Sequence, residues 1–299
     1  MLEFCIHVLI MSAVFGIAAV SLNLQAGTSG LLNFGQIALF GIGAYAVAIL
    51  TRAGLPWPAA VLAGMAAAAA GGFAIGKLGR DLAAEYWALA TLAVAELVRL
   101  VAINEEWLTG GPQGIGGIGG LFPALDGVAR ALAILTLSAA LLLAVALVAQ
   151  HLGRTQFGRV LRLMRENPDL ATALRHHIVA YKVRVLPIGG AMAGLAGGLY
   201  TLYLAFIGPD QLLPFETFLI WTMVVLGGLG NVAGAVLGAL LVTTLYAGIP
   251  FLKDVIALPS DLTGSLRVFS IGLIVLAGLM LKPQGLVPER LRRFHAQRP

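Results

Sequence analysis

Charged residues and cysteine are both scarce in this 299-residue chain. Only 11% of the residues are charged, whereas a soluble domain has about 25%. The hydrophobic share is 59%, and the mean hydropathy is +0.93. The single cysteine, Cys5, excludes an intrachain disulfide framework and a cysteine-cluster metal site. The histidines make no metal-ligand spacing with carboxylates, so no metal site is predicted. The composition excludes an ordinary soluble protein and indicates a membrane chain.

A phosphate-binding loop is also missing. Residues 71–78 reproduce the glycine and lysine spacing of such a loop, but Leu78 stands where a Ser or Thr would hold magnesium. The segment is alanine-rich and does not follow a β-strand. The sequence gives no support for a catalytic triad either. We therefore expect this chain to be no enzyme and to bind no cofactor; any ATP and magnesium would be held by a separate ATPase chain.

Long apolar segments fill most of the sequence. A helix needs roughly 20 apolar residues to cross a membrane, where its backbone must satisfy its own hydrogen bonds. The candidate segments are approximately 4–24, 31–50, 55–76, 84–103, 128–150, 185–207, 215–229, 232–250 and 266–281. The seventh is short, and the second contains Asn33, Gln36 and several glycines, so either can be broken or re-entrant. The prediction is an all-α polytopic bundle of about 8–10 spans, forming one membrane domain over residues 1–299.

Lysine and arginine are concentrated in two blocks. Residues 151–184 contain seven of them and the tail 282–299 contains five, which together are 12 of the chain's 19. Short loops rich in these residues stay in the cytoplasm. Both blocks are therefore predicted to be cytoplasmic, with the N-terminus and the loop 104–127 outside. The basic residues lack the interleaved aromatics of a nucleic-acid-binding surface, so no nucleic-acid partner is expected.

The cytoplasmic loop 151–184 contains an amphipathic helix pattern, with arginines three residues apart and apolar residues between them. An Asn-Pro-Asp sequence then supplies an N-cap and a first-turn proline for a second helix through about His177. The residues of interest are Gly158, Arg159, Arg162, Arg165, Glu166, Asn167 and Pro168. Their chemistry leaves two roles open: binding anionic lipid headgroups, or docking onto a protein.

Two polar pairs lie in predicted spans. Glu96 and Arg99 are three residues apart, and a local ion pair is favoured over a proton relay. Asn33 and Gln36 are candidates for lining a translocation pathway, and hydrogen bonding between helices is at least as good an interpretation.

The outward loop 104–127 carries a glycine-rich run that contains Thr109, Gly110, Gly111 and Gly114. Glycine lets backbone amides approach a ligand closely, but most such runs are simply turns. Glycines also recur every four residues at 190 and 194 and at 230, 234 and 238, which predicts close helix packing.

Several blocks, in order, resemble the permeases of branched-chain amino-acid ABC importers, specifically the LivM-type subunit. They lie at 22–24, 40–45, 85–92, 108–115, 158–159, 165–167, 193–200, 224–231 and 282–286. The resemblance implies a permease in a bacterial-type inner membrane, where it works with a second, LivH-type permease, two ATPase subunits and an extracytoplasmic substrate-binding protein. It also implies that the 158–177 hairpin is the coupling helix that docks into the ATPase.

The resemblance leaves the cargo open. Permeases that import urea, amides or aromatic acids share many of the same sequence motifs. The alternative from another class is a proton-coupled secondary carrier or channel, for which Glu96 would be the natural proton site.

Overall fold

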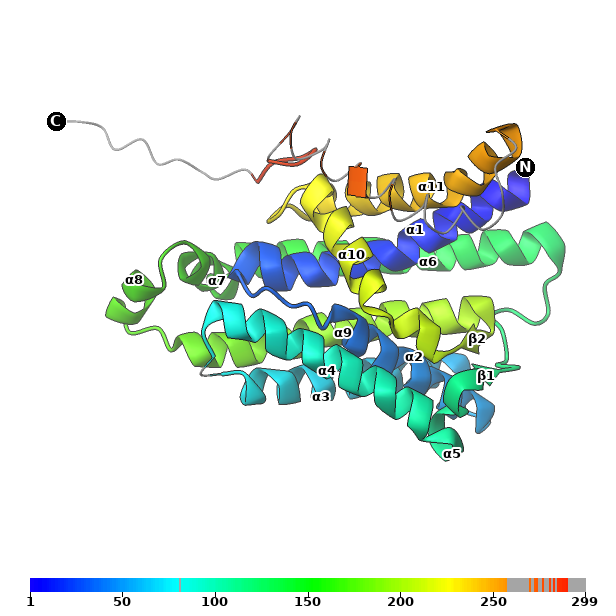
Figure 1. The fold of residues 1–299 in the computed structure, drawn as a ribbon, viewed down its shortest axis with the longest axis horizontal. Helices are drawn as coiled ribbons and strands as arrows, with labels where there is room; N and C mark the ends of the chain where they lie inside the picture. The colour runs from blue at the N-terminus through cyan, green and yellow to red at the C-terminus, as the bar shows by residue number, and fades with distance from the viewer. Residues whose placement is uncertain are drawn as a thin grey trace.

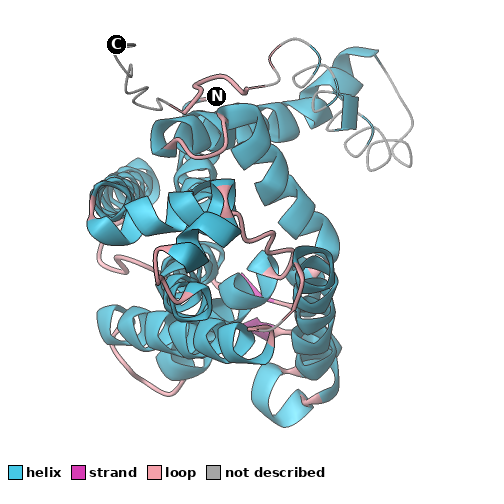
Figure 2. Cartoon of the chain, turned by 90° about the vertical axis from the view of Figure 1, so that its left-hand side faces the viewer, coloured by secondary structure: helices cyan, strands magenta, loops and turns pink. Residues whose placement is uncertain are grey.

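The computed structural model describes residues 1–80, 82–256, 269, 272, 273, 276, 280, 282 and 284–289. Its helices are α1 (Leu2–Leu22), α2 (Gln36–Arg52), α3 (Trp57–Leu78), α4 (Ala84–Asn104), α5 (Glu106–Thr109), α6 (Gly127–Arg154), α7 (Gln156–Glu166), α8 (Pro168–Ala173), α9 (Ile178–Leu204), α10 (Pro214–Gly227) and α11 (Val232–Ile256). A π-helical turn, Asn23–Thr28, extends α1, and β1 (Ile115–Gly116) pairs antiparallel with β2 (Phe206–Ile207). Figure 2 shows how little of the described chain is strand.

The predicted all-α polytopic class is confirmed. Eight of the nine predicted segments correspond to helices, and the ninth, 266–281, lies outside the described residues except for isolated positions. Among the described residues, five helices are long and apolar enough to cross a membrane: Leu2–Thr28, Trp57–Leu78, Tyr86–Asn104, Gly127–Arg154 and Ile178–Leu204. Shorter apolar helices cover Gln36–Arg52, Pro214–Gly227 and Val232–Gly248. The seventh segment is thus a short helix, as its composition predicts.

The long helices lie roughly side by side and give the molecule two distinct ends (Figure 1). We call the end that carries α7 and α8 the hairpin end, and the end that carries β1 and β2 the loop end. The first residue of α1 and the last residue of α9 lie at the loop end, whereas the last residue of α6 lies at the hairpin end. Glu289 contacts Arg165 of α7, so Glu289 also lies at the hairpin end.

Helices α2, α3 and α9 pack backbone to backbone. A methyl group added at Gly43 of α2 would overlap the backbone of Gly194 in α9, and one at Gly190 would lie 2.5 Å from the carbonyl oxygen of Ala68 in α3. Helices surrounded by lipid have no hydrophobic driving force between them, so their attraction comes from close van der Waals contact through small residues. Gly72, in the run that imitates a phosphate loop, serves the same purpose against the carbonyl of Leu186. The predicted close packing of the 190/194 pair is confirmed.

The α10–α11 pair uses the same chemistry. A methyl group at Gly234 or Gly238 would collide with the carbonyl oxygens of Gly227 and Met223 respectively. The turn between the helices requires Gly228 and Gly230, whose φ angles are +122° and +81°. The C-terminal segment completes this region, because Leu286 and Val287 donate backbone hydrogen bonds of 2.8 and 2.9 Å to Leu226 and Gly227. Those carbonyls belong to the last turn of α10, where no intrahelical donor remains.

The predicted second span begins later than expected. Helix α2 starts at Gln36 rather than near residue 31, and the chain from 30 to 35 is irregular. Irregular backbone survives inside a membrane protein only where other groups satisfy it. Here the Thr91 hydroxyl accepts from the amide of Phe34 at 3.0 Å, and the indole of Trp221 donates to the carbonyl of Asn33 at 3.0 Å. The break therefore precedes the helix, and neighbouring helices hold it in place.

Candidate functional site

Asn33 and Gln36 lie in a buried polar cluster with Ser21 and Gln25. All four side chains are 0% exposed. Asn33 donates to the Gln25 side-chain oxygen at 2.7 Å, and Gln25 donates to that of Gln36 at 3.0 Å. Gln36 donates to the Ser21 hydroxyl at 2.9 Å, and that hydroxyl donates to the carbonyl of Gly189 at 2.7 Å. These hydrogen bonds are the interhelical bonding that the sequence offered as an alternative to pathway lining.

The amphipathic hairpin is present as α7 and α8. On α7, Val160, Leu161 and Met164 are buried, and Gly158 lies against the carbonyl of Leu152. The Asn167 side chain caps α8 by accepting from the amide of Leu170 at 2.9 Å, and Pro168 occupies the first turn. The predicted extension to His177 is wrong. Helix α8 ends at Ala173, and Arg175 has a φ of +60°, which a continuing helix cannot contain.

The arginines of α7 do not share one exposed face. Arg165 donates to the carbonyl of Gly27 in the π-helical turn, and also to the Glu289 carboxylate at 2.7 Å. Arg162 donates to the carbonyl of Gly153, and its nearest contact with Glu289 is 3.9 Å. Arg159 is exposed, as are Glu166, Asn167 and Pro168. Arg162 and Arg165 therefore tie α7 to other elements of the chain, and the exposed tip of the hairpin is formed by α8 and the residues on either side of it.

Glu96 and Arg99 form the predicted local ion pair. The guanidinium Nε donates to the carboxylate at 2.9 Å, and an NH2 group makes a second contact at 2.5 Å. The side chains of Arg99 and Glu96 are 21% and 40% exposed. Each charge satisfies the other, so neither projects alone into a cavity.

The glycine-rich loop at the loop end is built from tight turns. Gly110, Gly111 and Gly114 have φ angles of +75°, +59° and +69°, a region that other residues rarely adopt. Thr109 is buried, and its hydroxyl donates to the carbonyl of Ala102 at 2.8 Å. Gly114 leads into β1, and a methyl group there would strike the carbonyl of Ile207. The glycines of this loop are therefore explained by the positive φ angles that its turns require.

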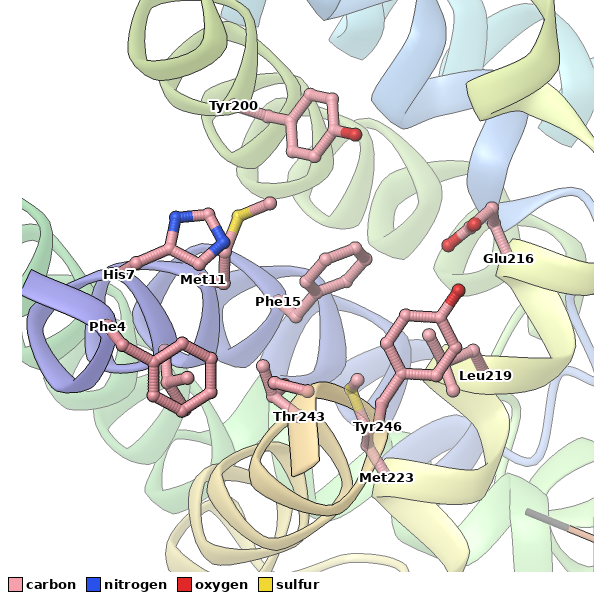
Figure 3. Close-up of a pocket in the computed structure, with 12 residues that line it drawn as sticks. Phe4, His7, Met11, Phe15, Tyr200, Glu216, Leu219, Met223, Thr243 and Tyr246 are labelled. Atoms are coloured by element: carbon pink, nitrogen blue, oxygen red, sulfur yellow. The ribbon is translucent and has the colours of Figure 1, made fainter. Parts of the chain in front are cut away.

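An apolar cavity of about 360 Å³ lies between α1, α9, α10 and α11 (Figure 3). It is near the loop end, where the Nδ1 atom of His7 lies 2.6 Å from the hydroxyl of Tyr203. The cavity is lined by Phe4, His7, Val8, Met11, Phe15, Tyr200, Glu216, Leu219, Met223, Thr243, Tyr246 and Ala247. None of the pathway residues predicted from the sequence lines it.

Tyr200 and Glu216 are two of the polar residues that line this cavity, from α9 and α10 respectively. The Tyr200 ring packs against the rings of Phe15 and Phe40, with centroid distances of 6.2 and 5.5 Å. Glu216 is in the first turn of α10, where the helix N-terminus favours a negative charge. Figure 3 shows its carboxyl group and the Tyr200 hydroxyl directed into the space between the helices. The candidate residues predicted from the sequence do not include Glu216.

The described residues contain no group of three or more His, Cys, Asp or Glu side chains that could hold a metal ion. Together, the apolar bundle and its projecting hairpin define a polytopic helical membrane protein, the class to which permeases belong.

The sequence places the chain in a family. The profile described as branched-chain amino acid transport system, permease component, matches residues 4–281, and the chain belongs to this family. The high-affinity branched-chain amino acid permease LivM of Salmonella typhimurium is 30% identical over 308 residues, covering 93% of this chain and 68% of that protein. A probable LivM of Methanocaldococcus jannaschii is 27% identical over 326 residues, covering 95% and 93% of the two chains.

A more distant similarity has a different cargo in its name. The autoinducer 2 import permease LsrC of Salmonella choleraesuis is 28% identical over 221 residues, covering 71% of this chain and 61% of that protein. No solved structure matches the chain.

Proposed function

We propose that this chain is one of the two membrane-spanning subunits of an ATP-driven importer, and that its cargo is a branched-chain or closely related amino acid. The observation that carries the proposal is the match of the family profile over residues 4–281 of a polytopic helical bundle. The absence of a phosphate loop from the sequence supports a separate ATPase. The partners would be a LivH-type permease, two ATPase subunits and an extracytoplasmic binding protein.

The exposed tip of the hairpin is the proposed ATPase contact. Leu170 of α8 and Leu174, the residue that directly follows α8, are 47% and 57% exposed, beside the exposed charges of Glu166 and Arg175. Exposed leucines on a short helix that projects from the bundle suit insertion into a groove of another protein. Arg162 and Arg165 would act differently, by linking the hairpin to the membrane helices of their own chain.

The proposed orientation puts the hairpin end in the cytoplasm of a bacterial-type inner membrane. The two basic blocks, 151–184 and 282–299, support this side, and the N-terminus and the loop 104–127 would then face outward. The cavity between α1, α9, α10 and α11 would lie in the outer half, on the side from which a binding protein delivers its cargo.

A docking test uses matched leucines. Replacing Leu170 and Leu174 together by Asp should lower ATP-driven uptake at least tenfold while the chain still inserts and purifies as a folded protein. The control is Leu125→Asp, because Leu125 is 38% exposed but follows the glycine-rich loop at the other end. Uptake at the unaltered level in the double variant would reject the docking assignment.

The alternative class, a proton-coupled carrier, is disfavoured by the Glu96–Arg99 pair. The Glu96 carboxylate is paired with Arg99 on its own helix and does not line the cavity, whereas a proton site on a translocation pathway would line that pathway. The deciding experiment is uptake into liposomes that contain either this chain alone or the complete set of subunits. ATP-dependent uptake of leucine only by the complete set supports the importer. Uptake by the isolated chain that a proton gradient drives and Glu96→Gln abolishes would establish the carrier instead. Urea, amides, aromatic acids and autoinducer 2 serve as competing cargoes in the same assay.

A further inference from the structure

The cavity near the loop end contains a carboxylate that the described chain does not neutralise. Glu216 makes none of the ion pairs between described residues, and its side chain donates to or accepts from none of their hydrogen bonds. Its favourable local partner is the N-terminus of α10, whose partial positive charge is equivalent to about half an elementary charge. A charged group in an apolar interior normally has a counter-charge, because its removal from water is costly.

The walls around Glu216 specify what kind of cation would fit. Seven of the twelve lining side chains are apolar, contributed by Phe, Val, Met, Leu and Ala residues. Among the described lining residues Glu216 is the only carboxylate, whereas a calcium or magnesium ion takes six or more oxygen ligands. The cavity volume of about 360 Å³ is in the range of small-molecule sites. These features suit an organic ammonium group that carries an apolar body.

A second polar group lies within reach of the same space. The Thr243 hydroxyl is buried and has no hydrogen-bond partner among the described residues, although its residue lines the cavity. An unsatisfied buried hydroxyl costs free energy unless a ligand or water pairs with it. The Tyr200 hydroxyl also faces the cavity and takes part in none of the hydrogen bonds between described residues (Figure 3). These hydroxyls can donate to a carboxylate.

We propose that this cavity is a binding site for the cargo inside the permease, in which Glu216 pairs with the α-ammonium group of an apolar amino acid. The apolar side chain would contact Met11, Leu219 and Met223, and the hydroxyls of Tyr200 and Thr243 would receive the carboxylate. This inference rests on the proposed function for the identity of the cargo. The pairing of Glu216 with an ammonium group rests on the cavity alone.

The test is equilibrium binding to the full chain in lipid nanodiscs, with three radiolabelled probes of similar shape. L-leucine has an ammonium and a carboxylate, isoamylamine has only the ammonium, and isocaproate has only the carboxylate. Leucine and isoamylamine should bind and compete with each other, and isocaproate should bind at least tenfold more weakly. Glu216→Gln should weaken isoamylamine binding at least tenfold, because a charge-assisted hydrogen bond becomes a neutral one. Glu216→Asp should restore part of it.

Glu106→Gln is the matched control, since this exposed glutamate lies at the same end but outside the cavity, and it should bind all three probes as the parent chain does. Thermal melting of each variant in nanodiscs separates loss of the site from loss of the fold. The inference is overturned if the parent chain shows no saturable isoamylamine binding at millimolar concentration, if isocaproate binds as well, or if Glu216→Gln changes nothing. The parent-chain ranking tests the preference for an ammonium group without any variant, and Glu216→Asp tests the role of the residue if the Gln variant misfolds.

The two proposals fail separately. Isoamylamine binding that depends on Glu216, without any ATP-dependent leucine uptake by the complete set of subunits, would keep the site and reject the importer. Uptake that survives Glu216→Gln unchanged, together with no probe binding, would keep the importer and reject the site.

Discussion

The contact between Arg165 and Glu289 joins three parts of the chain that are far apart in sequence, and its strength can be measured. Arg165 donates to Glu289 at 2.7 Å and to the carbonyl of Gly27, while its side chain is 22% exposed and that of Glu289 is 16% exposed. A hydrogen bond to a charged group is worth about 1.5–3 kcal/mol, and the burial reduces solvent screening. Replacing Arg165 by Met removes both contacts and leaves Glu289 with only the 3.9 Å contact to Arg162 among the described residues.

We expect Arg165→Met to lower the free energy of unfolding by about 3 kcal/mol and Glu289→Gln by about 1.5 kcal/mol, because the second variant keeps the Gly27 contact. The double variant should be less destabilised than the sum of the two, by a coupling energy of about 1 kcal/mol. The assay is denaturation of the purified chain in mixed detergent micelles, followed by circular dichroism and fitted as a double-mutant cycle.

Arg159→Met is the matched control, since Arg159 is exposed on the same helix and, among the described residues, donates only to the carbonyl of Arg154, at 3.2 Å. It should change the free energy of unfolding by less than about 0.5 kcal/mol. Strictly additive effects of Arg165→Met and Glu289→Gln would refute the reasoning. Equal losses from the two single variants would show that the Gly27 contact contributes nothing.

Two further perturbations probe the interior of the bundle. Gly43→Ala should destabilise the chain by about 2 kcal/mol or more, because the new methyl group overlaps the backbone of Gly194. The control is Gly153→Ala, whose methyl group meets nothing within 4 Å, so this variant should be neutral or stabilising. Equal thermal melting temperatures of the two variants would contradict the packing account. Gln36→Leu should lower the free energy of unfolding by about 2–3 kcal/mol, because Gln25 and Ser21 each lose a hydrogen-bond partner. The control is Gln156→Leu, which should cost little because Gln156 is exposed. A similar loss of stability at both positions, measured by the same denaturation, would argue against the buried cluster.

Features that are local in sequence could be predicted. The length of the apolar segments alone predicted eight helices. The spacing of the arginines predicted α7, and the Asn-Pro-Asp sequence predicted the start of α8. The Glu96–Arg99 pair is three residues apart on one helix, so helical geometry dictates the contact. The end of α8 was misjudged because nothing in the residues from 174 to 177 forbids a helix, and the observed positive φ at Arg175 depends on how the chain turns into α9.

Long-range contacts could not be predicted. Arg165 and Glu289 are 124 positions apart, and the cavity gathers His7, Tyr200, Glu216 and Tyr246 from four helices. No spacing rule connects such residues, because their proximity depends on how the helices cross. One signal was available for Glu216: it is an acidic residue at the start of a short apolar helix, and an ionisable residue in that position is a functional candidate by default.

The C-terminal segment has a practical consequence for anyone who wishes to label this protein. The amides of Leu286 and Val287 donate to the last two carbonyls of α10, and Glu289 accepts a hydrogen bond from Arg165. The described C-terminal residues as far as Glu289 are therefore part of the folded permease. A fluorescent or affinity tag that replaces residues from Lys282 onward would remove these donors from two carbonyls of α10 and would remove the Glu289 partner of Arg165. A tag joined after Pro299 keeps these contacts.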